Sequence, residues 1–300
     1  MYRGFPKALL NSIVCHSCLG DLKVDIDVGD GERIVSGLIQ CSSCGIRYPI
    51  EDGIVNLLGE QAPLDEVSKQ EVLSRDAEAD IYDEAFCTPE GNLMEATPTL
   101  EHLGHVDRKR ILELGCGTGR ITLPLAPKVS SILALDYSRG SLVHLARKCP
   151  DDTPVGLVSA DITQARFRDG YFDGAVSAQV LQHIRYLEAR RQFYAAVRDA
   201  LRPGSVFVLS AYHYDLKKRL RREPRDGFHS SNIFFHHFTS GEIRDEMSPF
   251  FEVDEIHPLE IHIPWVHKAF KDKVRFSRSL EHLPLLNLFG EWLIFKGFRN

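Results

Sequence analysis

The stretch Ile111-Leu112-Glu113-Leu114-Gly115-Cys116-Gly117-Thr118-Gly119-Arg120 places an apolar run directly before three alternating glycines. The apolar run predicts a buried strand, and residues 121–126 predict the start of a helix. Glycines at such a junction permit a tight turn and a close approach of the backbone to a ligand. The G-x-G-x-G spacing differs from the G-x-G-x-x-G of dinucleotide-binding turns. We therefore predict a ligand-binding corner between strand and helix, in which Glu113 can face a cationic amino group.

Strands and helices are expected to alternate on both sides of this corner. Strands are predicted at 111–114, 132–135, 155–158, 172–177 and 206–211, with helices at 121–126, 141–147 and 189–201. This alternation predicts a parallel sheet covered by helices on both faces. Two more strands are expected at 251–257 and 292–298, with lid-like insertions at 213–238 and 259–289. The predicted fold class is α/β with a Rossmann-like sheet.

Acidic residues follow the predicted strands at the places where a nucleotide-like ligand needs them. Asp136 ends the second strand about 20 residues after the glycine turn, a position typical of an acid that binds ribose hydroxyls. Asp161 follows the third strand and can accept the amino group of an adenine, with Ile162 against the ring. Because ligands bind beyond the carboxyl ends of such strands, these residues should meet at one edge. The alternative is a purely structural corner, with Cys116 as a small buried residue in either case.

This series resembles the class I methyltransferases that depend on S-adenosylmethionine (SAM), most clearly in residues 109–212. The glycine turn, the two strand-end acids and the run from Phe172 to Ile184 match in type, order and spacing. The resemblance implies a seven-stranded sheet with a final antiparallel strand. It also implies SAM contacts at Tyr82, Glu113, Gly115, Cys116, Gly117, Gly119, Asp136, Tyr137, Asp161, Ile162 and Ala178.

Four of the seven cysteines form two C-x-x-C pairs, Cys15 with Cys18 and Cys41 with Cys44, separated by 22 residues. Two such pairs supply the four thiolates of a tetrahedral zinc site, and a closed set of four ligands indicates a structural Zn²⁺. A unit of this size has little core of its own, so metal binding would contribute to its folding. The alternatives are unligated cysteines and a redox pair.

The run from Leu38 to Ile54, with its C-x-x-C, Tyr-Pro-Ile and Asp-Gly-Ile elements, resembles the Trm112-like zinc domains. Free-standing members of that family activate methyltransferases by covering an apolar face, so the resemblance implies the same role within this chain. We expect three parts: a zinc-binding domain at 1–60, an acidic helical connector or lid at 61–108, and the methyltransferase domain at 109–300.

Composition and charge limit the classes of protein to which this chain can belong. The 300 residues are 43% hydrophobic and 26% charged, and the formal net charge is −6. This is ordinary for a soluble globular protein and argues against a strongly basic nucleic-acid binder. Without a run of 18 apolar residues or a signal peptide, we expect no membrane span and a cytoplasmic location. The sequence sets no oligomeric state.

Methyl transfer to oxygen or nitrogen can need a general base, and three residues are candidates for the catalytic site. His183 is the first, because its loop should overlook the cofactor, and His213 and Tyr212 after the fifth strand are the next. A helix-capping or packing histidine is the alternative role for His183.

Two classes of methyl acceptor compete, and a third hypothesis involves no catalysis. A small molecule, such as a secondary metabolite, sugar or lipid precursor, is favoured by the 180–184 and 237–243 runs, which resemble the small-molecule branch of the family. RNA or a translation protein is the alternative, based on the zinc unit and the basic run at 217–222. A non-catalytic SAM-binding scaffold is disfavoured by the intact set of Glu113, Asp136 and Asp161.

Overall fold

The computed structural model describes residues 2–58, 66–86, 92–261, 272–281 and 283–300. The N-terminal strands are β1 (Phe5–Pro6), β2 (Leu22–Gly29), β3 (Arg33–Cys41), β4 (Arg47–Glu51) and β5 (Ile54–Asn56). The later strands are β6 (Arg110–Leu114), β7 (Ser131–Asp136), β8 (Val155–Ser159), β9 (Phe172–Ala178), β10 (Leu201–Tyr212), β11 (Asp226–Phe228), β12 (Phe234–His236), β13 (Phe251–Ile261) and β14 (Gly290–Arg299).

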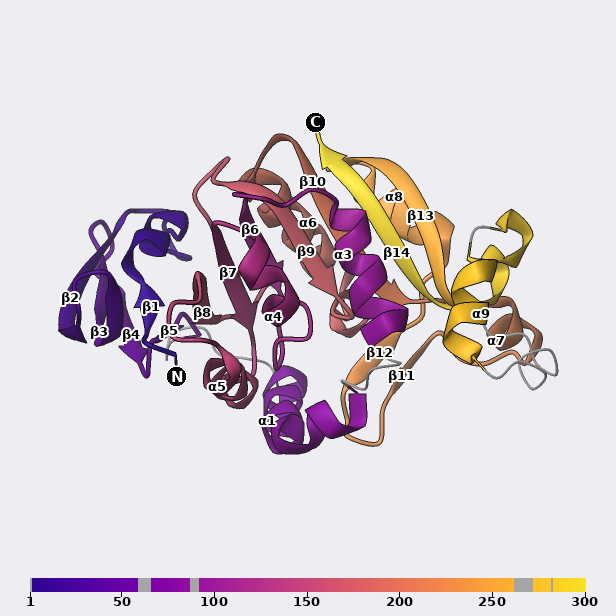
Figure 1. The fold of residues 1–300 in the computed structure, drawn as a ribbon, viewed down its shortest axis with the longest axis horizontal. Helices are drawn as coiled ribbons and strands as arrows, with labels where there is room; N and C mark the ends of the chain where they lie inside the picture. Colours follow the sequence, from indigo (N-terminus) through magenta and orange to yellow (C-terminus); the bar gives the residue numbers. More distant parts are fainter. Residues whose placement is uncertain (1, 59–65, 87–91, 262–271, 282) are drawn as a thin grey trace.

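Helices alternate with these strands (Figure 1). The α-helices are α1 (Glu66–Phe86), α3 (Thr97–Leu103), α4 (Thr122–Leu125), α5 (Arg139–Lys148), α6 (Leu187–Ala200), α7 (Leu216–Leu220), α8 (Ser240–Met247) and α9 (Lys273–Leu280). Short helical turns are η1 (Lys7–Ser12), η2 (Asn92–Ala96), η3 (Ala126–Lys128), η4 (Leu181–His183) and η6 (Pro284–Phe289).

The central part of the sheet has the order β8-β7-β6-β9-β10-β14-β13. The pairs from β8 to β10 are parallel, and β14 runs antiparallel to both β10 and β13. The predicted seven-stranded sheet with an antiparallel final strand is therefore confirmed. The carboxyl ends of β6, β7, β8 and β9 lie at one edge, which is where a ligand site is expected.

Each face of the sheet is covered by its own set of helices. Leu112 and Leu114 belong to a core cluster with residues of α6 and α8, whereas Ile111 belongs to a second cluster with residues of α3, α4 and α5. Successive strand residues thus point to opposite faces, and both faces are apolar because both are buried.

The N-terminal unit continues this sheet and has no separate one. β5 pairs in parallel with β8, so the strand order continues as β1-β3-β4-β5-β8, with β2 paired to β3. Within the described residues the whole sheet has twelve strands. Phe5, Ile39 and Tyr48 share one core cluster with Phe193 of α6 and Phe207 of β10. The sequence predicted a zinc-binding part and a methyltransferase part separated by a connector, and in the structure these two parts share one sheet and one core cluster.

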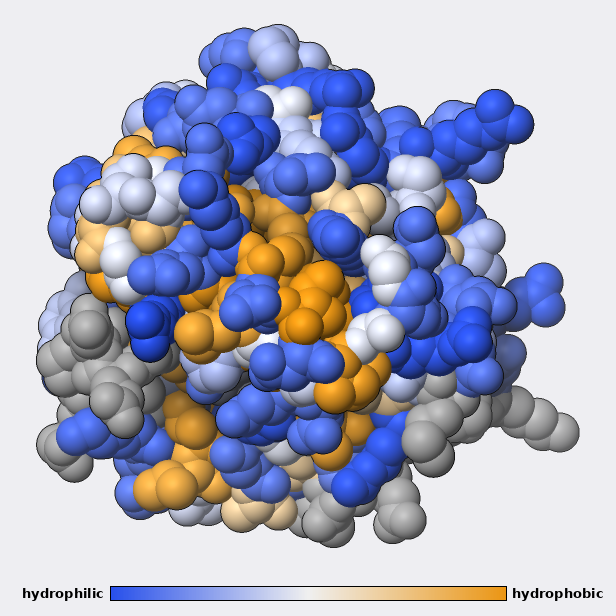
Figure 2. Space-filling model, turned by 90° about the vertical axis from the view of Figure 1, so that its left-hand side faces the viewer, coloured by the Kyte–Doolittle hydropathy of each residue, from blue (hydrophilic) through white to orange (hydrophobic). Residues whose placement is uncertain are grey.

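Gly156 in the middle of β8 makes this junction close. A Cβ atom at Gly156 would lie 2.8 Å from Phe5 Cε2 and 2.9 Å from Leu9 Cδ1. The outer end of the N-terminal unit is mostly hydrophilic around a central apolar area (Figure 2). The apolar side chains at the rim of its core are Leu10, Leu22, Val24, Ile26 and Ile46.

The two predicted insertions have defined structure in their described parts. Residues 213–238 hold α7 and the antiparallel hairpin of β11 and β12. The strand predicted at 251–257 extends to Ile261, so the second insertion begins as a continuation of β13, and its described remainder holds α9 and η6.

Candidate functional site

A cavity of about 430 Å³ lies at the carboxyl ends of the central strands. Its floor is the glycine turn after β6 and the residues that end β7, β8 and β9, while α1, η4 and β12 form its walls. A volume of this size falls in the range of about 300–1,000 Å³ that is common for small-molecule sites.

The glycine turn can adopt its shape only with glycine. Gly115, Gly117 and Gly119 all have positive φ angles, of 78°, 51° and 99°. A Cβ atom at Gly115 would lie 2.1 Å from Val180 Cγ2, and one at Gly119 would lie 2.4 Å from Leu145 Cδ1. A Cβ at Gly117 would meet nothing within 4 Å, so this glycine opens the turn toward the cavity. Besides the backbone angle, glycine at 115 and 119 allows close packing against neighbouring side chains, whereas glycine at 117 leaves space for a ligand.

Glu113 brings a buried carboxyl group to this cavity. Its residue exposure is 3%, and Thr122 Oγ1 donates a hydrogen bond of 2.8 Å to Oε2. Burial raises the pKa of Glu113 to about 8, and the nearby charge of Asp136 adds to the increase. A cation bound beside Glu113 would favour the carboxylate and reverse this shift.

Asp136 connects the end of β7 to the glycine turn. Oδ2 accepts a hydrogen bond of 2.7 Å from Gly117 N, and Oδ1 accepts one of 2.9 Å from Ser138 N. Burial raises the pKa of Asp136, although these N–H donors act in the opposite direction. Each oxygen keeps a lone pair for a further donor, as binding of ribose hydroxyls requires.

Asp161 is held at the adjacent strand end by its own loop. Oδ1 accepts hydrogen bonds from the backbone N and Oγ1 of Thr163, and Oδ2 accepts one of 2.8 Å from Gln164 Nε2. Ile162 beside it is 7% exposed and lines the same cavity. An apolar side chain next to a fixed acid can accommodate a flat ring with a polar edge.

The structure brings together most residues predicted to bind a cofactor. Those that line the cavity are Glu113, Gly115, Cys116, Gly117, Asp136, Tyr137, Asp161, Ile162 and Ala178. Burial raises the pKa of the Cys116 thiol well above its usual value, so this side chain is an inert part of the wall. Gly119 lies behind the wall. The Tyr82 side chain belongs to a stretch of α1 outside the described side chains.

His183 lines the cavity opposite the glycine turn. Its Nδ1 donates a hydrogen bond of 2.6 Å to the carbonyl oxygen of Phe234. Burial lowers the pKa of His183 well below its usual value, and the charge of Arg75 adds to this effect. The ring is therefore neutral at physiological pH, with its proton on Nδ1 and a lone pair on Nε2.

The other two candidate catalytic residues lie behind this wall. His213 is 2% exposed, its Nδ1 donates to Gly290 O at 2.7 Å, and burial lowers its pKa to about 4. The Tyr212 ring packs against His183, with their centroids 5.9 Å apart, and against Trp292. Neither residue is among those that line the cavity.

The sequence-based prediction missed the walls. Glu71, Arg75 and Glu78 of α1 line the cavity, whereas the sequence predicted a connector or lid here, with only Tyr82 of this segment as a contact. Their spacing of three and four residues places them on one helix face, which was the available signal. Asp76 fixes α1 beside the cofactor loop by accepting hydrogen bonds of 2.5 Å from Ser138 Oγ and 2.9 Å from Gly140 N.

The far wall contains Arg185, Tyr186 and Phe234, which the sequence also did not reveal. The Arg185 guanidinium lies 5.3 Å from the centre of the Tyr186 ring and 5.8 Å from that of Phe234. A cation between two aromatic rings at a cavity mouth can bind a planar or anionic acceptor.

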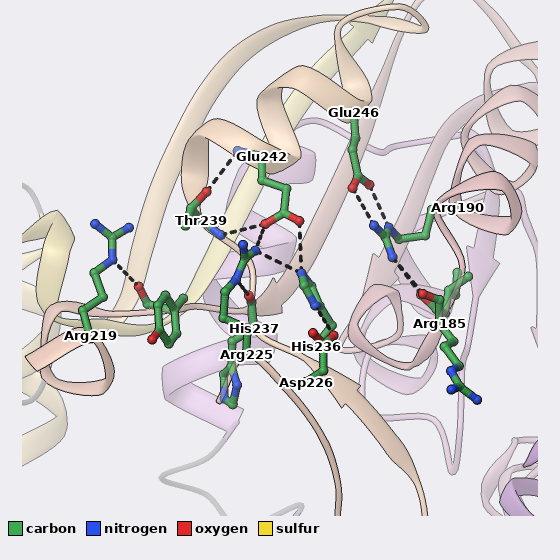
Figure 3. A network of polar contacts seen from close by, with 12 residues as sticks. Arg185, Arg190, Arg219, Arg225, Asp226, His236, His237, Thr239, Glu242 and Glu246 are labelled. Atoms are coloured by element: carbon green, nitrogen blue, oxygen red, sulfur yellow. Dashed lines mark hydrogen bonds and ion pairs between the residues drawn. The ribbon is translucent and has the colours of Figure 1, made fainter. Parts of the chain in front are cut away.

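A polar network behind this wall holds it in place (Figure 3). Arg190 bonds both carboxylate oxygens of Glu246, at 2.8 and 2.7 Å, and donates to the carbonyls of Ile184 and Arg185. His236 lies between two carboxylates, with Nδ1 2.6 Å from Asp226 Oδ1 and Nε2 3.1 Å from Glu242 Oε1.

Glu242 also pairs with Arg225 and completes a capping box with Thr239. The network thereby fastens the β11–β12 hairpin to α8. The network itself does not line the cavity. It holds in place the loop that carries Arg185 and the strand that carries Phe234, and both of these residues line the cavity.

The four predicted metal ligands come together in the N-terminal unit. Cys15 Sγ lies 3.6 Å from Cys44 Sγ, and Cys18 Sγ lies 3.4 Å from Cys41 Sγ. Four sulfurs bound to one Zn²⁺ at about 2.3 Å lie about 3.8 Å from one another, so these four sulfurs fit such an ion. Backbone N–H groups of Ser43 and Cys44 donate to Cys41 Sγ, which favours a thiolate.

Family comparisons agree with this geometry. Residues 112–209 match the methyltransferase domain family, and residues 7–53 match the Trm112p-like protein family. The malonyl-[acyl-carrier protein] O-methyltransferase of Geobacter sulfurreducens is 30% identical over 155 residues, 50% of this chain and 55% of that protein. The chain spans about half the length of the curated relatives it matches.

Solved structures share the fold. A 1,6-didemethyltoxoflavin-N1-methyltransferase of Burkholderia thailandensis, bound to 1,6-didemethyltoxoflavin and S-adenosylhomocysteine, has a TM-score of 0.54 and 19% identity, with 80% of this chain and 93% of that chain covered. A chain in the complex between the Trm112 methyltransferase activator of Haloferax volcanii and a methyltransferase has a TM-score of 0.54 and 16% identity. The match covers 79% of this chain and 99% of that chain. Among the described residues, no helix is long and apolar enough to cross a membrane.

Proposed function

We propose that this chain, whose residues 112–209 form a methyltransferase domain, transfers a methyl group from SAM to an oxygen or nitrogen atom of a small molecule. The observation that carries the proposal is the convergence of the glycine turn, Asp136 and His183 on one cavity. SAM supplies a methyl group already activated by a sulfonium, so the protein's main task is to align the acceptor with it.

The cavity residues divide into three groups for holding SAM. Glu113 faces the amino group of the methionine portion, and the glycine turn lets the backbone approach it. Asp136 binds the ribose hydroxyls, and Asp161 with Ile162 holds the adenine ring. This assignment rests on the family resemblance and on the position of these residues along the cavity.

His183 is the proposed general base. Its Nδ1 proton is engaged by the carbonyl oxygen of Phe234, so Nε2 is the nitrogen that accepts a proton from the acceptor group. Its lowered pKa keeps the ring neutral and able to accept this proton at physiological pH.

A small acceptor fits the described walls better than RNA does. The aromatic rings of Tyr186 and Phe234 line the cavity, and three of the five basic residues at 217–222 form ion pairs within the chain. Lys217 pairs with Glu291, Lys218 with Asp215 and Arg221 with Glu223. Relatives with related domains are named for an acyl-carrier-protein substrate and for a demethylmenaquinone substrate, which also favours a metabolic acceptor.

We further propose three functional parts: a zinc-binding unit at 1–60, a connector at 61–108 that closes the cavity, and a methyltransferase domain at 109–300. Cys15, Cys18, Cys41 and Cys44 would hold a structural Zn²⁺ with no open coordination position. The zinc-binding unit would support the methyltransferase sheet through β5.

The deciding experiment is methyl transfer from labelled SAM into fractionated lysate of the native host, with and without ribonuclease. Label in a low-mass organic extract would support the proposal. Label in ribonuclease-sensitive material would replace it with an RNA methyltransferase. Absence of SAM binding by calorimetry would contradict both the enzyme and the SAM-binding scaffold, whereas SAM binding without methyl transfer to any fraction would favour the scaffold.

A further inference from the structure

A second cluster of metal-binding side chains lies at the opposite edge of the sheet from the four cysteines. His102 near the end of α3, and Glu255 and His257 of β13, offer ligand atoms within 4.8 Å of one another. Strand β13 is the last in the sheet order, whereas the N-terminal unit occupies the other end (Figure 1). The cluster is therefore separate from the cysteine site.

The hydrogen bonding of His102 leaves a lone pair directed at a carboxylate. Its Nδ1 donates to the carbonyl oxygen of Pro98 at 2.8 Å, so in the neutral ring Nε2 has no proton. Nε2 lies 3.8 Å from Glu255 Oε2, which is beyond hydrogen-bond distance. Two electron-rich atoms thus face each other across a gap that a cation would fill.

His257 lies between two carboxylate groups. Its Nδ1 lies 3.6 Å from Glu255 Oε1, and its Nε2 lies 3.8 Å from Glu281 Oε2. Glu281, which follows α9, is 4% exposed, and its Oε1 has no hydrogen-bond partner within the described residues. A carboxylate buried to this extent without a full set of partners is costly unless a positive charge lies nearby.

We propose that this cluster binds a divalent transition-metal ion, with His102 Nε2, Glu255 and His257 Nδ1 as ligands. Metal-bound histidines usually donate their other N–H to a carbonyl or a carboxylate. Here Pro98 O takes this role for His102, and Glu281 Oε2, 3.8 Å from Nε2, faces the second nitrogen of His257. Imidazole with carboxylate suits Zn²⁺, Co²⁺ or Ni²⁺ rather than Ca²⁺ or Mg²⁺.

The ion would fasten the C-terminal insertion to the sheet. His102 comes from α3, the next two ligands from β13, and Glu281 from the end of α9. Arg278 and Glu101 already form an ion pair of 2.6 Å between the same two helices. A metal ion would add a second, less exposed connection, because the His102 and His257 side chains are 14% and 13% exposed.

The test uses the full-length protein with its cysteine site saturated with Zn²⁺. Calorimetric titration with Co²⁺ should show that one further ion binds per chain. The absorption spectrum of the Co²⁺-bound protein should lack the thiolate-to-cobalt charge-transfer band of a cysteine site. His257→Gln should weaken this binding by at least about tenfold. The matched control is His105→Gln, since His105 is exposed and outside the cluster, and it should bind Co²⁺ as the wild type does.

Failure of the zinc-saturated wild type to bind Co²⁺ would overturn the proposal, and so would equal affinity of the two histidine variants. In either case the cluster would be a set of direct contacts between histidine and glutamate side chains, without an ion. If circular dichroism shows that His257→Gln does not fold, Glu255→Gln provides the same comparison, because the Glu255 side chain is 46% exposed and its replacement leaves little unpaired in the core.

Discussion

At the scale of single residues, Glu113 gives the proposed cofactor site a pH dependence. Its pKa of about 8 means that the free protein carries this carboxyl mainly in the protonated form at pH 7. Binding a cationic amino group requires the carboxylate and so releases a proton. The affinity for SAM should therefore rise as pH increases from about 6 to about 7.5, by at most about tenfold per unit.

Calorimetric measurement of the SAM affinity across this pH range checks the prediction. The number of protons released on binding follows from comparing the binding enthalpies in buffers of different ionisation enthalpy. Glu113→Gln should bind SAM more weakly and lose the pH dependence, because the amide cannot ionise. A flat affinity in the wild type would remove Glu113 from contact with the amino group.

Substitution of His183 separates chemistry from cofactor binding. His183→Gln should lower kcat by about 10²–10⁴-fold, the usual contribution of a general base, and should leave the affinity for SAM unchanged. Steady-state kinetics and calorimetry on the same preparation measure both. An unchanged kcat would show that the acceptor loses its proton without His183, which would then be a packing residue beside Tyr212.

The sequence predicted the floor of the site and missed its walls for a physical reason. Asp136 and Asp161 follow recognisable strands, and the carboxyl ends of parallel strands must meet. Arg75 and Phe234 reach the cavity because α1 and the β11–β12 hairpin fold over it, and no local pattern fixes where a helix or hairpin docks. His213 lies away from the cavity, because its ring is held by the carbonyl oxygen of Gly290 in a distant part of the chain.

At the scale of elements, Gly156 determines how closely the N-terminal unit approaches β8. Gly156→Val should destabilise the protein by about 1–3 kcal/mol, because the added carbons would overlap the buried side chains of Phe5 and Leu9. Urea unfolding measures the change. Gly241→Ala is the control: nothing lies within 4 Å of its Cβ position, and alanine favours the helix by about 0.5–1 kcal/mol.

Equal stability of Gly156→Val and the wild type would mean that the N-terminal unit can move away from β8 at little cost. That result would contradict a shared core. A destabilised Gly241→Ala would show instead that glycine substitutions perturb this protein for reasons other than local packing.

At the scale of the whole molecule, the common core should couple the proposed Zn²⁺ of the cysteine cluster to the methyltransferase fold. Cys41→Ser should lower the free energy of unfolding by about 4 kcal/mol, as loss of a structural metal does, and unfolding should remain a single transition. The protein that stays folded should still bind SAM, since Cys41 lies outside the cavity. Denaturant titration with metal analysis tests this.

Cys149→Ser is the matched control, because Cys149 is 3% exposed but lies outside the cysteine cluster. It should keep its zinc. Two separate unfolding transitions in Cys41→Ser would contradict the coupling, and full zinc content with normal stability would contradict a structural metal.

The sequence indicated the overall class of both parts but not their connection. The C-x-x-C pairs and the glycine turn are local patterns, and each predicted its own part. The pairing of Ile54 and Val55 with Leu157 and Val158 joins residues about a hundred positions apart, and a short apolar strand carries no signal of its partner.

The hydrogen bonds between β5 and β8 have a consequence for how such a protein is supplied in a cell. An activator that is a separate polypeptide must be made in matching amounts, must find its enzyme, and leaves it on dilution. Here the supporting unit and the sheet that it supports come from one message in a fixed one-to-one ratio. Neither competition from other enzymes nor a fall in concentration can part them, so activity should scale with the amount of this one chain.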